Sequence, residues 1–148
     1  MRKSIFITIL IVVALIFVIG GNNGGGTGCQ CNFSTAKVSD AKICDNMTEA
    51  VCPQDFPELP ATTPKIFVSC RLKYSVSNTK VKFSWMYYGE TKIKIDTVIY
   101  DTGDRIGNLD LYSSLSKPAN NWPKGVYEVI IQIQTDNAKP LVKQFNIK

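Results

Sequence analysis

Histidine is absent from the 148 residues of this chain. In enzymes, histidine is the usual general base and the usual partner of a serine or cysteine nucleophile, and it is the commonest metal ligand. A hydrolytic triad would therefore lack its base here, and a zinc site would lack its usual nitrogen ligands. The absence argues against an enzyme, and we expect no catalytic residues, no metal and no cofactor.

Long runs of like charge are also missing. The chain has 17 basic and 12 acidic residues, which gives a formal net charge of +5. The lysines of KVK at 80–82 and of KIK at 92–94 alternate with apolar residues, so on a strand they lie together on the solvent face. Because the sequence contains no basic block of the kind that follows a phosphate backbone, we expect no nucleic-acid partner.

One loop gathers oxygen ligands of the kind that bind calcium. The segment YDTGDRIGNLD contains Asp101, Asp104, Asn108 and Asp110. Their spacing does not match that of an EF-hand loop, and Arg105 stands among the acids. We interpret these residues as solvated turn residues and predict no metal site.

The long apolar run of the chain stands near its beginning. Residues 5–19 are apolar except for Thr8, and they follow Arg2 and Lys3. This pattern matches the basic and apolar regions of an export signal, in which the cations stay inside and the following chain crosses. The run is shorter than the roughly 20 residues that a full membrane span needs. We therefore expect residues 1–21 to be a signal or signal-anchor segment.

A Gly-rich segment, GNNGGGTG, follows the apolar run and has the composition of a flexible linker. We expect residues 22–32 to be this linker and residues 33–148 to be a β-sandwich domain. The export signal places that domain on the extracytoplasmic side of a membrane, at the cell surface.

Three kinds of tether remain open. Thr27-Gly28-Cys29 resembles the end of the lipoprotein motif, with Cys29 as the candidate for lipidation, although Gly26 departs from the motif. An uncleaved signal anchor would hold the domain at the membrane without lipid. Cleavage without lipidation would release it as a secreted protein.

Export also makes disulfides chemically available to the five cysteines. The short segment from Cys44 to Cys52 has a polar, turn-like centre, and these two residues are the best candidates for a bridge. Because five is odd, one thiol is lipidated, free or bonded to another chain. If Cys29 carries lipid, Cys31 and Cys70 become the candidates for a second bridge.

Apolar residues alternate with polar ones repeatedly from Phe33 onward, without a convincing helical pattern. The alternation predicts about seven short strands at intervals of roughly 8–12 residues, which is typical of an all-β sandwich of two sheets. The first strand is expected at 36–44, with an irregularity near Asp40. Four prolines exclude residues 52–64 from a central strand.

The alternation assigns inward side chains on several of the predicted strands, and the strongest strand carries Tyr127, Val129, Ile131 and Ile133. Strand residues that are two apart point to the same face of a sheet. Three more predicted inward rows are Ile66, Val68, Cys70, Leu72 and Tyr74; Val81, Phe83, Trp85 and Tyr87; and Ile93, Ile95, Thr97 and Ile99.

Counted in this order, the strands resemble those of immunoglobulin-like domains. Cys70 falls on the second main strand and Trp85 on the third, and Gly125-Val126-Tyr127 resembles the tyrosine corner that opens strand F. Two residues after that tyrosine, where antibody domains have their second cysteine, stands Val129. The resemblance implies an immunoglobulin-like sandwich without the core disulfide of antibody domains.

The chain from 33 to 148 is also similar to an uncharacterised domain of prokaryotic surface lipoproteins. The similar segments are FSTAKVSDAKIC at 33–44, KVKFSWMYY at 80–88 and WPKGVYEVIIQI at 122–133. In that group the domain is a tethered accessory module without established catalytic residues. The resemblance implies a place at the cell surface and names no ligand.

Aromatic residues outside the inward rows are the candidates for an interaction surface. Tyr88, Tyr112 and Trp122 are less well placed for the core, and tyrosine and tryptophan are favoured at interfaces. For Trp122, the alternative is that it packs across its own loop. We expect a membrane-tethered extracytoplasmic binding or interaction module, whose partner is a protein or a glycan, with these residues in an exposed patch. The alternative is a structural subunit of a surface filament or envelope assembly, joined by strand addition.

Overall fold

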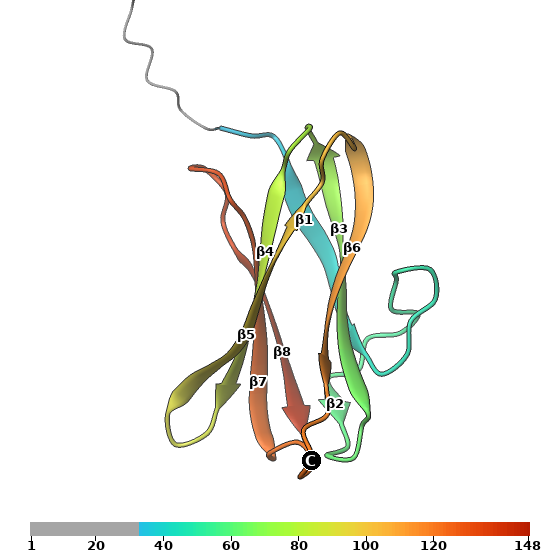
Figure 1. Ribbon diagram of the computed structural model, residues 1–148, viewed down its shortest axis with the longest axis vertical. Coiled ribbons are helices and arrows are strands. Elements are labelled where there is room, and N and C mark those ends of the chain that lie inside the picture. The colour runs from blue at the N-terminus through green and yellow to red at the C-terminus, as the bar shows by residue number, and fades with distance from the viewer. Residues whose placement is uncertain (1–32) are drawn as a thin grey trace, which may run out of the picture. The chain divides into compact units, whose positions relative to one another are not determined.

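The computed structural model describes residues 33–148, which form two β-sheets that face each other (Figure 1). One sheet has the strand order β1-β3-β6, and the other has the order β2-β8-β7-β4-β5. The prediction of an all-β sandwich is confirmed, with eight strands where the alternation predicted about seven. The strands are β1 (Lys37–Cys44), β2 (Glu58–Leu59), β3 (Lys65–Ser75), β4 (Lys80–Tyr88), β5 (Lys92–Asp101), β6 (Gly107–Ser116), β7 (Gly125–Ile133) and β8 (Leu141–Ile147).

The predictions of a signal or anchor at 1–21 and of a linker at 22–32 lie outside the described residues. Cys29 and Cys31 lie outside them as well. Within residues 33–148, no helix is long and apolar enough to cross a membrane. The tether and its chemistry therefore stay predictions.

The core lies between the two sheets, where the inner faces of both carry apolar side chains. On β4, Val81, Phe83 and Trp85 are fully buried, as the alternation predicted. The Trp85 side chain reaches across the interior, and its Nε1 donates a hydrogen bond to Ser113 Oγ of β6 at 3.0 Å. A buried indole whose only polar group is satisfied keeps the full benefit of its burial. This contact places β4 opposite β6.

Two irregularities interrupt the strands of the three-stranded sheet. The register between β1 and β3 shifts between Ser39 and Lys42, and Asp40 has a φ of 55°, so the irregularity predicted near Asp40 is confirmed. A second shift between Leu72 and Ser75 includes Tyr74, whose φ is 56°. The prediction that Tyr74 points inward is wrong, because this bulge turns its side chain outward and leaves it exposed.

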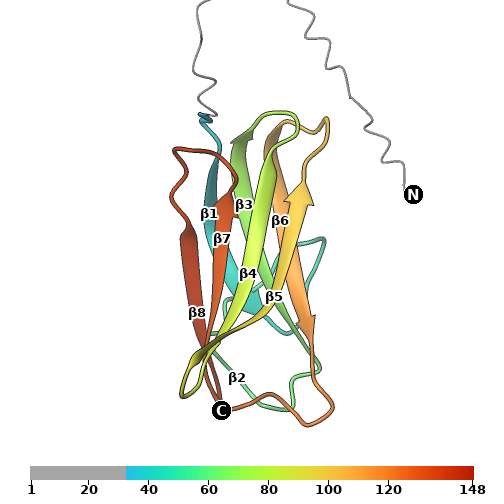
Figure 2. The same ribbon diagram turned by 60° about the vertical axis from the view of Figure 1, so that its left-hand side comes forward.

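The prediction that Ile93, Ile95, Thr97 and Ile99 of β5 face a closed core is also wrong. Every residue of β5 except Tyr100 is exposed. β6 is the last strand of the three-stranded sheet, and β4 already lies opposite it. The five-stranded sheet therefore extends one strand further, and the β4–β5 hairpin projects away from β6 at its turn (Figures 1 and 2).

A bulge in β5 also changes which of its residues share a face. Trp85 stands opposite Asp96 while Met86 stands opposite Lys94, so Ile95 is the extra residue. Beyond the bulge, Val98 stands opposite Phe83 and therefore lies on the inner face. Thr97 and Ile99 turn to the outer face, opposite Ser84 and Lys82.

The other edge of the five-stranded sheet is covered by the proline-containing segment. Its two-residue strand β2 runs parallel to β8, with Glu58 opposite Asn146 and Leu59 opposite Ile147. The backbone N–H of Asn146 donates to Pro57 O at 2.8 Å. The segment is an edge strand at most, which agrees with the expectation that its prolines exclude it from the centre of a sheet.

Candidate interaction surface

The three aromatic residues proposed from the sequence do not form one patch. Tyr112 is 50% exposed and lies on the outer face of the three-stranded sheet, opposite Ser69 of β3. Tyr88 is half-buried on the outer face of the other sheet, where its hydroxyl donates to Glu128 Oε1 at 2.9 Å. Trp122 is only 5% exposed, so the prediction that it lies in an exposed patch is wrong.

Trp122 is buried because its loop folds back over the end of the sandwich. Its indole Nε1 donates to Thr63 O at 2.7 Å, and its backbone N–H donates to Ala61 O at 2.9 Å. Its ring meets the Tyr127 ring edge-on, with centroids 6.2 Å apart. The hydrophobic gain and the hydrogen bonds together hold the ring inside, beside the segment that contains β2.

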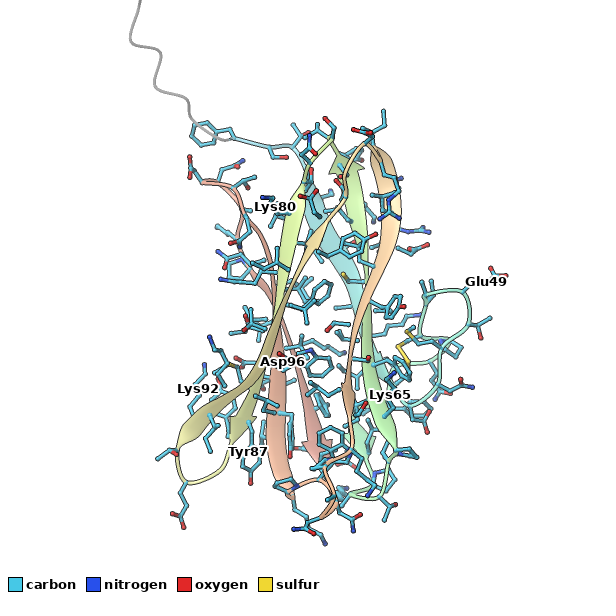
Figure 3. The ribbon with its side chains drawn as sticks, in the orientation of Figure 1. Glu49, Lys65, Lys80, Tyr87, Lys92 and Asp96 are labelled. Atoms are coloured by element: carbon cyan, nitrogen blue, oxygen red, sulfur yellow. A yellow bond between two sulfur atoms is a disulfide. The ribbon has the colours of Figure 1, made fainter. Side chains whose placement is uncertain are left out.

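The predicted bridge between Cys44 and Cys52 is present, and Figure 3 shows it beside the loop that contains Glu49. Behind this loop, the Cys52 N–H donates to the buried Ser69 Oγ at 2.9 Å. The bridge therefore holds the loop against the outer face of β3.

Cys70 lies in the interior and has no disulfide partner among residues 33–148. Burial, assisted by the negative charge of Asp110, raises the pKa of this thiol to about 12, so it is protonated and unreactive at neutral pH. Its candidate partner Cys31 lies outside the described residues, and the pairing of the two stays a prediction.

The acidic residues near Asp101 do not converge on one point. Asp101 Oδ1 accepts a hydrogen bond from the Gly103 N–H at 2.9 Å, which is a local turn contact. Asp110 Oδ1 and Oδ2 accept hydrogen bonds from Arg71 Nε and Nη2 at 3.0 and 3.1 Å, which makes a bidentate ion pair. Across residues 33–148, no group of three or more histidine, cysteine, aspartate or glutamate residues is arranged to hold a metal ion.

Several exposed apolar side chains lie next to one another on β5. We define the β5 flank as the exposed apolar side chains on the inner face of this strand, Ile93, Ile95 and Val98. They are 51%, 41% and 41% exposed. On the outer face Ile99 is 57% exposed. Apolar side chains gathered on an edge strand mark a site where another chain can pair with the strand and cover these side chains.

The β5 flank continues into a small apolar pocket of about 170 Å³, which we call the aromatic pocket. A dry cavity of roughly 150 Å³ holds a molecule the size of benzene, so this pocket has room for one ring or one branched side chain. Its lining comes from β4, β5, β7 and the loop before β7. The lining residues are Tyr87, Ile93, Ile95, Pro118, Trp122, Pro123 and Tyr127.

The aromatic lining presents ring surface and not polar atoms. The Tyr87 hydroxyl, the Tyr127 hydroxyl and the Trp122 indole N–H each donate to a backbone carbonyl, at 3.0, 2.8 and 2.7 Å. Burial, with the neighbouring Tyr87, raises the pKa of Tyr127 to about 12, so this hydroxyl stays protonated. Because the polar atoms are already satisfied, the pocket selects apolar groups.

Two glycines fix the position of the Tyr87 ring. A Cβ added to Gly89 would lie 2.8 Å from Tyr87 Cε1, and one added to Gly125 would lie 3.2 Å from Cε2. Gly125 also has a φ of 141°, which other residues rarely adopt. The ring fits between these glycines and packs on Tyr127 with centroids 4.8 Å apart. The wall of the pocket is therefore preformed.

On the outer face, a polar network joins β5 to the interior strands. Glu128 Oε1 accepts a hydrogen bond from the Tyr88 hydroxyl, and Oε2 accepts one from Gln144 Nε2, both at 2.9 Å. Lys92 Nζ lies 3.7 Å from Glu128 Oε1 and 4.8 Å from the centre of the Tyr88 ring. Burial alone would raise the pKa of Glu128, but the hydrogen bonds and the charge of Lys92 together leave that pKa below its usual value. The Tyr88 contact and Glu128 raise the pKa of Lys92, so both groups stay charged at neutral pH. The network fixes the first residue of β5.

The β5 flank was missed from the sequence because β4 and β5 show the same alternation. Alternation identifies a strand and its faces, and it does not identify whether another sheet lies opposite. The lysines at 92 and 94 do not mark the edge either, because the central strand β4 has the same spacing at 80 and 82.

A scan against protein-family models gives no match to this chain, and a search of the curated proteins gives none either.

Proposed function

We propose that this chain is a membrane-tethered extracytoplasmic interaction module that binds a protein partner through the edge of β5. The observation that carries the proposal is a ten-residue edge strand with exposed apolar side chains. In the part of the chain that the structure describes, β4 is the only strand that pairs with β5. The outward N–H and C=O groups of such a strand are available to pair with a strand of another protein.

The aromatic pocket supports a protein partner over a glycan. Glycan sites combine ring faces with polar groups that reach the sugar hydroxyls, whereas the polar atoms of Tyr87, Tyr127 and Trp122 are engaged with backbone carbonyls. An added strand uses both parts of this surface, because its backbone pairs with β5 and one apolar side chain enters the pocket.

We further propose that the sandwich is immunoglobulin-like. Its support is the strand order β1-β3-β6 facing β8-β7-β4, which corresponds to strands A, B and E facing G, F and C. The Tyr127 hydroxyl donates to Pro123 O at 2.8 Å, as a tyrosine corner does, and Trp85 is buried on the third main strand. In this arrangement β5 takes the place of strand C′ beside strand C.

The proposed location rests on the N-terminal sequence and on the disulfide. Residues 1–21 have the pattern of a signal or signal anchor. The bridge between Cys44 and Cys52 is of a kind that forms in oxidising compartments outside the cytoplasm.

The second candidate function is a structural subunit joined by strand addition, and the same edge of β5 favours it. A filament needs two different edges that pair with one another, so that each copy binds the next. Because β2 pairs with only Asn146 and Ile147 of β8, a filament would pair β5 with the remaining edge of β8 or with an edge of the three-stranded sheet.

Photo-crosslinking from β5 in the cells that make the protein tests the proposal. Ile99→benzoylphenylalanine places the crosslinker beside the strand edge, and Tyr112→benzoylphenylalanine is the matched control at a similarly exposed position on the other sheet. We expect adducts of defined mass from position 99 that disappear when Ile95→Lys is added, and none from position 112. No adduct from position 99, or the same adducts from both positions, would overturn the proposal.

A further inference from the structure

The charges along β5 are unevenly distributed. Lys92 and Lys94 stand in its first half, and Asp96 and Asp101 stand in its second half. Antiparallel pairing of this strand with a copy of itself brings the basic half of each copy against the acidic half of the other. Parallel pairing in register would place like charges side by side, which destabilises a sheet.

We propose that the partner of the β5 flank is β5 of a second copy of this chain, paired antiparallel about a two-fold axis between Asp96 and Thr97. The inference rests on the proposed function and names its partner. In this register Lys92 stands opposite Asp101 of the second copy, and Ile95 stands opposite Val98 of the second copy. Each such pair occurs twice, because a two-fold axis relates the copies.

The bulge at Ile95 makes this register consistent with the two faces of the sheet. Ile93, Ile95 and Val98 lie on the inner face of β5, and Tyr100, opposite the buried Val81, lies there too. The two-fold pairing sets inner residues against inner residues, with Ile93 opposite the Tyr100 of the second copy. Outer residues meet outer residues in the same way, since Lys94 stands opposite Ile99. Only at the central pair, Asp96 and Thr97, does an inner residue stand opposite an outer one.

The aromatic pocket has a suitable occupant in this arrangement. Ile93 and Ile95 line the pocket, and they stand opposite Tyr100 and Val98 of the second copy. Tyr100 is half-buried in its own chain, with the Arg105 guanidinium 5.3 Å from its ring centre. An aromatic ring or a valine side chain matches a pocket of about 170 Å³ with an apolar lining.

The pairing closes after two copies. Once β5 meets β5, the joined sheet ends on both sides at β2, which pairs with Asn146 and Ile147 at the end of β8 in each copy. A two-fold interface uses the same surface on both subunits, so no free surface of this kind is left to bind a third chain. The proposed pairing of β5 with β5 therefore gives a dimer.

A charge exchange tests the register. Lys92→Asp places two aspartates opposite each other at both ends of the interface, and Asp101→Lys places two lysines there. The double variant Lys92→Asp/Asp101→Lys restores opposite charges with their signs reversed. We measure the dimer dissociation constant of the full chain in a mild detergent by sedimentation equilibrium. We expect each single variant to raise it about ten-fold and the double variant to return it close to the unmodified value.

The double variant separates this inference from a structural role of either residue. Lys92 and Asp101 are about 30 Å apart along one strand, so they cannot compensate for each other within a single copy. Lys92→Asp also disturbs the contacts with Glu128 and Tyr88, and that disturbance would persist in the double variant. Rescue therefore requires that position 92 of one copy faces position 101 of the other.

Ile95→Lys provides a second test that does not depend on the ion pairs. A charge on the inner face of an edge strand opposes pairing, and Ile95 is exposed enough for the change to leave the fold intact. We expect this variant to be monomeric. A dimer that persists in Ile95→Lys, or single charge variants with an unchanged dissociation constant, would overturn the inference.

Failure of the inference and failure of the proposed function give different results. A chain that is monomeric at its highest soluble concentration, yet yields adducts with another polypeptide from position 99, overturns the inference that the partner is a second copy. The same result supports the proposed function. Adducts at twice the chain mass from position 99 support both. A monomer without adducts overturns both.

Discussion

The two edges of the five-stranded sheet differ in what covers them. At β8 the chain adds β2, a hydrogen bond from Asn146 to Pro57, and an ion pair between Lys143 and Asp55. At β5 the described chain adds no strand, and Ile93 and Ile99 are more than half exposed. Natural sheets usually cover or charge their edges to prevent unwanted pairing. The contrast between an open edge with exposed apolar side chains at β5 and a partly covered edge at β8 supports the proposal that β5 is the binding edge.

The largest expected difference in the free energy of unfolding is between truncating one aliphatic residue at each edge. Leu59 of β2 is buried, so Leu59→Ala removes packed methyl groups and should lower the free energy of unfolding by about 3 kcal/mol. Ile93→Ala removes similar groups from an exposed position and should cost about 0.5 kcal/mol. Urea unfolding of the two variants measures both values. Equal losses would show that β5 is as much a part of the core as β2 is.

The disulfide should give the next largest effect. The bridge between Cys44 and Cys52 spans a sequence separation of 8 and anchors the segment that leads to β2. Cys44→Ala/Cys52→Ala should lower the free energy of unfolding by about 2.5 kcal/mol, because the unfolded chain regains the freedom of that loop. An unchanged urea midpoint in the double variant would contradict this role.

Asp55 joins the covered edge to the core and should contribute somewhat less. Its Oδ1 accepts the N–H of the buried Ile43 at 2.9 Å, and its Oδ2 pairs with Lys143. Asp55→Ala leaves that N–H without its acceptor and should cost about 2 kcal/mol. Lys143→Met removes only the partly exposed ion pair and should cost less than about 1 kcal/mol. The reverse order in thermal or urea unfolding would show that the ion pair is the principal link.

The smallest effect concerns Glu128, whose network extends from β8 to β5. Because the folded-state pKa of Glu128 is lowered, its contribution is present above the usual value of 4.5 and is lost as the pH falls through the lowered pKa. Glu128→Gln should cost about 1 kcal/mol at neutral pH, and this difference should shrink as the pH falls below about 4.5. A difference that stays constant across this range would show that the carboxylate charge contributes nothing.

The sequence predicted the strands better than it predicted their surroundings. Alternation located the inward row of Val81, Phe83 and Trp85, because those residues lie between two sheets. The short polar segment between Cys44 and Cys52 identified the bridge, since its ends lie close together in any turn. These features depend on local chain geometry, which the sequence determines directly.

The candidate surface depends on which strands lie opposite each other, and alternation holds no information on that. The row of Ile93 and Ile95 looks like a core row until the opposite sheet is seen to end at β6. Bulges at Tyr74 and Ile95 then reverse the faces of the following residues, and neither has a glycine or proline to mark it. The sequence left open whether Trp122 packs across its loop or lies in an exposed patch, because its burial depends on Thr63, which is 59 residues away in the chain.

Hydrogen–deuterium exchange of the native protein tests the central claim most directly. The amides of β5 and β8 are compared in the full chain extracted in mild detergent, first concentrated and then diluted until it is monomeric by sedimentation. If β5 is the binding edge, the amides between Ile93 and Tyr100 that do not donate to β4 exchange slowly in the concentrated protein and rapidly after dilution, while those of β8 stay unchanged. Exchange at β5 that is rapid and identical in both states, whatever the state of assembly, would contradict the claim.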